Sequence, residues 1–253
     1  PPVHDDRTII ESRLRRLVAE RINPARYGAR VPFDVSRWEA PGEPVSAAEA
    51  ATKAYVPFAV GEAFGRPWGT TWFRMSATIP DSWAGGTVSA IIDLGFTNSP
   101  GFQSEGLLWA LGDCGDWEPL RAINPLNRDV PVVAAAKGGE RVEFTLEAAS
   151  NPEIAHDRPD PNSDLSTAST TPIYSLTRAE LVVVNSEVIA LRHDVAVLDG
   201  LMRELPFDQP RRHEILRALD RMMDCLDLDD IVGSAAVARA ELAEVLSRPA
   251  VAS

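Results

Sequence analysis

Hydrophobic and polar residues alternate along three stretches in the middle of the chain. In residues 72–79 one face of an extended strand would carry Phe73, Met75, Ala77 and Ile79, and the other Trp72, Arg74, Ser76 and Thr78. Residues 87–96 and 141–148 repeat the alternation, and shorter apolar runs occur at 106–111, 130–135 and 179–184. A period of two is typical of half-buried strands, and turn-forming clusters separate these runs. The pattern predicts an antiparallel β-sandwich, jelly-roll-like.

Helical periodicity marks both ends of the chain. Residues 8–22 carry an apolar stripe at helical spacing, Thr8 and Glu11 have the spacing of a capping box, and Asn23-Pro24 is expected to end this helix. Three further helical stripes follow residue 185. Between residues 24 and 71 we expect irregular connections with short extended pieces and one helical turn at 46–53. The predicted organisation is an N-terminal helix and connection (1–30), a sandwich domain (31–185) and a helical linker (186–253).

Charge and cysteine content narrow the function classes. The 253 residues carry a net charge of −12 and include two widely separated cysteines, Cys114 and Cys225. An acidic chain without a block of basic residues repels phosphates, so neither nucleic acid nor an anionic membrane is an expected partner. No apolar run is long enough for a membrane span, and the first residues lack the pattern of a signal peptide. We therefore expect a cytoplasmic protein without structural disulfides.

Motifs for catalysis or metal binding are missing from the sequence. There is no Gly-x-Ser-x-Gly elbow, Cys/His arrangement, phosphate loop or dinucleotide fingerprint. The four histidines, His4, His156, His193 and His213, each lack the neighbours of a metal site. Carboxylates are available in or near the predicted strands, but nothing pairs them across a sugar as a glycosidase requires. The sequence therefore predicts no catalytic residue, cofactor site or metal ligand.

Tryptophans are the remaining candidates for a site. Trp72 lies on the strand face opposite Phe73, Trp68 and Trp83 bracket that strand, and Trp109 is expected to be buried. Trp117 is placed on a loop beside Asp113 and Asp116, a context suited to an aromatic platform for a sugar. These three residues form the candidate carbohydrate-binding site. Packing in a core or an interface is the alternative, and it is the commoner use of large aromatic side chains.

Several segments point to one enzyme family. Residues 65–74 read GRPWGTTWFR and residues 79–83 read IPDSW. Both resemble the N-terminal region of the α-mannosidases of glycoside hydrolase family 38, in its cytosolic, vacuolar and bacterial branch. Residues 105–109, 121–128, 144–151 and 179–185 resemble later segments of that region, in the same order.

The resemblance implies that the chain is part of a bacterial, zinc-dependent, retaining α-mannosidase. In the family, a Gly-x-x-His-x-Asp metal-binding segment opens the catalytic domain after the helical bridge, and residues 1–253 contain no counterpart of it. We therefore expect this chain to be inactive alone, with the zinc and the aspartate nucleophile in the catalytic domain. Its expected partners are that domain and further copies of the enzyme. The alternatives are a stand-alone carbohydrate-binding module for mannose-containing glycans and a pure oligomerisation domain.

Overall fold

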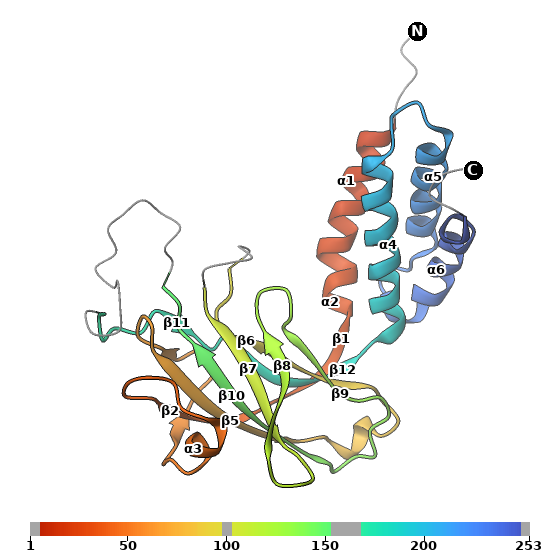
Figure 1. The fold of residues 1–253 in the computed structure, drawn as a ribbon. Helices are drawn as coiled ribbons and strands as arrows, with labels where there is room; N and C mark the ends of the chain where they lie inside the picture. The colour runs from red at the N-terminus through yellow and green to blue at the C-terminus, as the bar shows by residue number, and fades with distance from the viewer. Residues whose placement is uncertain (1–5, 98–102, 153–167, 249–253) are drawn as a thin grey trace. The chain divides into compact units, whose positions relative to one another are not determined.

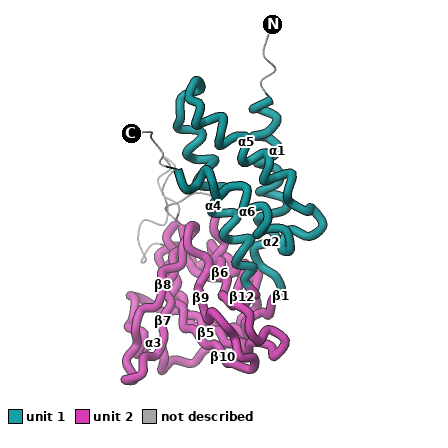
Figure 2. The backbone as a smooth tube through the Cα atoms, turned by 90° about the vertical axis from the view of Figure 1, so that its right-hand side faces the viewer, with its two compact units in different colours: residues 1–28, 184–253 teal, residues 29–183 magenta. Residues whose placement is uncertain are grey.

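The computed structural model describes residues 6–97, 103–152 and 168–248. The chain forms two compact units, shown in different colours in Figure 2. The helical unit comprises Pro1–Gly28 and Val184–Ser253, and the sandwich unit comprises Ala29–Val183. Each unit has a hydrophobic cluster of its own.

Two main sheets make up the sandwich unit (Figure 1). The four-stranded sheet has the order β1 (Tyr27–Pro32), β12 (Arg178–Val184), β6 (Val88–Asp93) and β9 (Asp129–Val133). The six-stranded sheet has the order β3 (Val56–Phe58), β2 (Asp34–Glu39), β5 (Thr70–Thr78), β10 (Arg141–Ala149), β7 (Glu105–Leu111) and β8 (Trp117–Ile123). A small sheet pairs β4 (Ala63–Phe64) with β11 (Tyr174–Ser175). The predicted antiparallel sandwich is confirmed.

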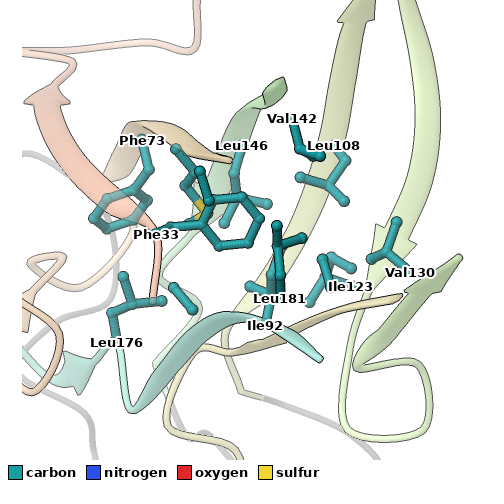
Figure 3. Packing of buried hydrophobic residues seen from close by; sticks show 14 of the residues in the cluster. Phe33, Phe73, Ile92, Leu108, Ile123, Val130, Val142, Leu146, Leu176 and Leu181 are labelled. Carbon is teal, nitrogen blue, oxygen red and sulfur yellow. The ribbon is translucent and has the colours of Figure 1, made fainter. Parts of the chain in front are cut away.

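Apolar side chains from both main sheets fill the space between them (Figure 3). Phe73 of β5 and Leu146 of β10 are paired in register and fully buried. Phe73 also makes edge-on contacts with the rings of Phe58 and Phe64, at centroid distances of 5.3 and 5.1 Å. The inward residues are those that the alternation in β5 and β10 predicts. Trp83, which brackets β5 in the sequence, also lies in this core.

The segment before β5 is more regular than the sequence analysis expects. Residues 24–71 contain the strands β1 to β4 as well as the helix α3 (Ala47–Ala51). The helix is the predicted turn, and its cap is Ser46, whose Oγ accepts a hydrogen bond of 3.2 Å from the Glu49 amide. The sequence predicts only short extended pieces here, because no side chain of β1 or β2 is fully buried and their hydrophobic alternation is weak.

Every strand at an edge of the two main sheets contains a proline. Pro32 lies in β1 and Pro131 in β9, at the edges of the four-stranded sheet, while Pro57 in β3 and Pro119 in β8 occupy the edges of the six-stranded sheet. Proline lacks the N–H group that a further strand would need, so these residues protect the edges from pairing with other chains.

The helical unit consists of an N-terminal helical segment and three C-terminal helices. They are α1 (Arg7–Leu17), a π-helical turn (Val18–Ile22), α2 (Asn23–Ala25), α4 (Ser186–Glu204), α5 (Pro210–Cys225) and α6 (Ile231–Ser247). Buried residues of these helices form one cluster, including Leu14, Leu191, Leu219 and Leu242. None of the helices in the described ranges combines the length and the apolar character needed to cross a bilayer.

Two details of the first helix differ from the sequence expectation. Its N-cap is Asp6, so Thr8 lies inside the helix and the predicted capping box of Thr8 and Glu11 is wrong. Glu11 instead forms an ion pair with the Arg7 guanidinium, at 3.8 Å. The helix also continues past Asn23, because the π-helical turn Val18–Ile22 leads directly into α2, which contains Pro24.

Candidate functional site: the outer face of the six-stranded sheet

The outer face of the six-stranded sheet carries an aromatic cluster. Trp72 of β5 is fully buried there beneath Ala47 and Ala50 of α3. Four further aromatic residues pack around it while staying partly exposed: Trp38, Tyr55, Trp109 and Trp117. The prediction that Trp72 lies on the face opposite Phe73 is confirmed, and α3 is the element that covers it.

A hollow of about 1410 Å³ opens along this sheet, and its lining combines outer-face residues such as Arg74 and Trp109 with residues of the sandwich core such as Phe58 and Met75. Side chains and backbone of β2, β5, β10, β7 and β8 line it, together with the chain around β3. One row across the sheet follows from the strand register: Ser36, Arg74, Thr145, Trp109 and Pro119. The first four of these residues line the hollow. Its floor is therefore polar toward β2 and β5 and aromatic toward β7 and β8.

The orientation of Trp109 is set by a glutamate on the neighbouring strand. Its Nε1–H donates a hydrogen bond of 3.1 Å to Oε2 of Glu147 in β10. Burial raises the pKa of the Glu147 carboxyl above its ordinary value, and the hydrogen bond from Trp109 opposes part of that rise because it favours the charged form.

Arg74 connects the hollow to the segment that covers Trp72. Its guanidinium lies 4.0 Å from the centre of the Tyr55 ring, and Nη2 donates a hydrogen bond to the Ala51 carbonyl. Burial raises the pKa of the Tyr55 phenol, and the positive charge of Arg74 opposes the rise. These contacts hold the chain that follows α3 against the sheet.

The structure places the predicted sugar-site residues on one hairpin, formed by β7 and β8. Trp117 is the first residue of β8, not a loop residue, and it faces Leu111 across the hairpin and lines the hollow. Asp113 and Asp116 are exposed in the turn between β7 and β8, which the Gly112 amide closes with a 2.8 Å hydrogen bond to the Asp116 carbonyl. Trp109, expected to be buried, is half-buried on the outer face.

Arg74, Thr145 and Glu147 were missed as site residues. All three were assigned correctly to the polar faces of their strands, where solvent-facing residues are normally only solubilising. What the alternation could not reveal is which strands are neighbours. Trp109 and Glu147 are 38 positions apart, and they meet because β7 pairs with β10.

Metal-binding side chains do not gather in this part of the protein. Within residues 6–97, 103–152 and 168–248, no three of the His, Cys, Asp and Glu side chains lie close enough together to hold a metal ion. His193 lies in α4 and His213 in α5, where its Nε2 is 3.1 Å from the Phe207 carbonyl oxygen. His4 and His156 lie outside the described residues. The described residues therefore do not fit a zinc site.

The sandwich unit matches the model of a known protein family. The family model described as "Alpha-mannosidase, jelly roll domain" matches residues 31–182. The chain belongs to this family. The match spans the sandwich unit almost from end to end, so the resemblance of residues 65–74 and 79–83 is confirmed at the level of the domain.

Curated relatives are α-mannosidases. "Alpha-mannosidase 2C1" of Homo sapiens is 28% identical over 205 residues, covering 79% of this chain and 18% of that protein. "Alpha-mannosidase G" of Dictyostelium discoideum is 24% identical over 194 residues, covering 74% of this chain and 16% of that protein. The chain thus spans less than a fifth of the length of these relatives. Among solved structures, a β-glucuronidase from Ruminococcus gnavus matches with a TM-score of 0.39 and 14% identity, covering 62% of this chain and 29% of that one.

Proposed function

We propose that this chain is the non-catalytic β-sandwich and helical part of a bacterial, zinc-dependent, retaining α-mannosidase. The observation that carries the proposal is the family match over residues 31–182. The relatives support it, because their similarity to this chain covers about three quarters of its length and both are named α-mannosidases.

In this proposal the catalytic groups belong to a separate domain of the same enzyme. Zinc and the nucleophile are assigned to that domain, since the described residues bring no suitable ligand set together. The sandwich and the helices would support the catalytic domain and assist the assembly of a homo-oligomer in the cytoplasm. Because the edge strands carry prolines, assembly would use the faces of the sheets or the helices and not the addition of strands.

The nucleotide sequence downstream of the Ser253 codon tests this proposal. We expect it to encode a Gly-x-x-His-x-Asp segment, and we expect its full product to hydrolyse α-mannosides and to form an oligomer. Deletion of residues 29–183 from that product should reduce the oligomer in sedimentation experiments. A reading frame that ends at Ser253, or a deletion product that assembles and hydrolyses like the intact protein, would contradict the proposal.

A stand-alone carbohydrate-binding module is the second candidate. It is favoured by the position of Trp117, which lines the hollow beside the turn that carries Asp113 and Asp116. Titration of the chain with mannose-containing oligosaccharides should then release or absorb heat and change tryptophan fluorescence. The absence of both signals would remove this candidate.

A further inference from the structure

The hollow over the six-stranded sheet has the dimensions of a site for an extended ligand. Its volume of about 1410 Å³ exceeds the range of roughly 300–1,000 Å³ that is usual for sites of single small molecules. Five neighbouring strands contribute to its lining. Arg74 and Trp109 lie two strands apart in register, which corresponds to about 10 Å at the usual strand spacing. A ligand that touches both must therefore span several chemical groups.

The aromatic side of the hollow presents two indoles on adjacent strands. Trp109 and Trp117 both line it and both remain partly exposed. The hydrogen bond from Trp109 to Glu147 restricts the rotation of one indole, which lowers the entropy that a ligand loses on stacking against it. An indole is a broad apolar surface with a polar rim, and this suits a sugar ring, whose C–H face is apolar and whose hydroxyls point outward.

The opposite side of the hollow offers hydrogen-bonding groups. Ser36 of β2 and Arg74 and Ser76 of β5 line it. Serine hydroxyls can both donate and accept hydrogen bonds, and a guanidinium presents several N–H donors. This combination matches the hydroxyl groups at the rim of a sugar.

The charges in the lining favour a ligand without net charge. The lining contains three acidic residues, Asp34, Glu62 and Glu143, and two basic ones, Arg74 and Arg141. Arg141 and Glu143 already form an ion pair of 2.6 Å with each other. Neither sign dominates, so a polyanion or a polycation gains little from long-range attraction here.

We infer that this hollow is a binding cleft for a neutral oligosaccharide, in which Trp109 and Trp117 stack on sugar rings while Arg74, Ser36 and Ser76 contact hydroxyls. These contact residues lie on the outer face of the sheet, and the contacts are independent of Asp113 and Asp116 in the adjacent turn. The inference does not depend on the proposed assembly with a catalytic domain, because only residues of the sandwich unit take part.

Titration calorimetry with the whole 253-residue chain tests the cleft. The probes are mannotetraose, cellotetraose and maltotetraose, each at concentrations up to about 10 mM, which allows millimolar dissociation constants to be detected. We expect at least one probe to bind, and we expect Trp117→Ala and Ser76→Ala to weaken it, the former by at least tenfold. Trp68→Phe, in a loop outside the cleft lining, and the double variant Asp113→Asn/Asp116→Asn should bind as the original chain does.

Three results would overturn the inference. The first is that none of the three probes binds. The second is that the Asp113/Asp116 variant loses binding while Trp117→Ala retains it, which would move the site to the turn. The third is that Trp117→Ala dissolves a dimer in sedimentation experiments, which would make a second copy of the chain the occupant. Thermal unfolding of each variant shows whether it is folded, and Ser76→Ala, the mildest change, keeps the test valid if Trp117→Ala unfolds.

Discussion

The indole of Trp109 and the carboxylate of Glu147 are joined across the outer face of the six-stranded sheet by a 3.1 Å hydrogen bond. Trp109 thereby gains a fixed position at the rim of the hollow, and Glu147 gains a partner for one of its half-buried oxygens. The Glu147 carboxyl is partly removed from water, and this burial disfavours its charged form.

Burial of the Glu147 carboxyl makes the stability of the sandwich unit depend on pH. Because burial raises the pKa of Glu147 above 4.5, the folded state holds this proton more tightly than the unfolded state does. The resulting stabilisation is present below about pH 4.5 and is lost as the pH rises through the raised pKa. In Glu147→Gln, where the amide oxygen can still accept the Trp109 hydrogen bond, we expect the unfolding free energy to fall less over this range. Urea unfolding at several pH values measures this dependence of the unfolding free energy on pH. Glu118→Gln is the control for the removal of one charge. Identical pH profiles for wild type and Glu147→Gln would contradict the prediction.

The core between the sheets should respond strongly to truncation of Phe73. This side chain is fully buried and contacts the rings of Phe58 and Phe64. Phe73→Ala should lower the unfolding free energy of the sandwich by about 3–5 kcal/mol, because it removes apolar contacts and leaves a cavity. The control is Thr78→Ala, at an exposed site in the same strand, which should stay within about 0.5 kcal/mol of wild type in denaturant unfolding. Equal losses in the two variants would show that the register of β5 is wrong.

Gly65 stands where a larger residue cannot fit. Its φ is +71°, and a Cβ at this position would overlap the side chain of Ser150. Gly65→Ala should therefore destabilise the sandwich by more than 1 kcal/mol. Gly42→Ala is the matched control, since a Cβ at Gly42 meets no atom within 4 Å, and its unfolding midpoint should hardly change. A Gly65→Ala midpoint equal to that of the control would rule out this close approach.

The edge prolines predict how the chain avoids aggregation. Replacing Pro119 of β8 by valine adds an N–H group to the edge of the six-stranded sheet and strengthens the strand propensity there. Sedimentation of Pro119→Val should reveal stronger concentration-dependent association than the original chain shows. Pro44→Val, in an exposed loop before α3, should behave like the original chain. If both variants sediment alike, the edge prolines have no protective role.

The strands that bury one full face were predictable from the sequence, and the weakly patterned ones were not. β5 and β10 alternate cleanly because every second side chain is excluded from water. In β8 five consecutive residues are exposed, so no alternation marks the strand, and Trp117 was placed on a loop for that reason. The core position of Trp83 could not be derived from strand periodicity, because Trp83 ends a short 3₁₀ turn, Asp81–Trp83, to which that periodicity does not extend.

The candidate site was less predictable than the fold. Trp117 and the outward position of Trp72 could be identified from the sequence, because bulky aromatic residues and strand alternation are visible locally. The contact of Trp109 with Glu147 and the row from Ser36 to Trp109 depend on the order of strands in the sheet. That order is set by tertiary packing between segments far apart in the chain.

Hydrolysis of an aryl α-mannoside by the purified 253-residue chain, with and without added zinc, tests the central claim most directly. We propose that this chain supplies the jelly-roll domain and the helices of an α-mannosidase, with the nucleophile and the metal elsewhere. We therefore expect no turnover above the buffer rate in either condition, and no zinc retained in stoichiometric amount. Saturable turnover that copurifies with the chain and disappears on removal of zinc would contradict it.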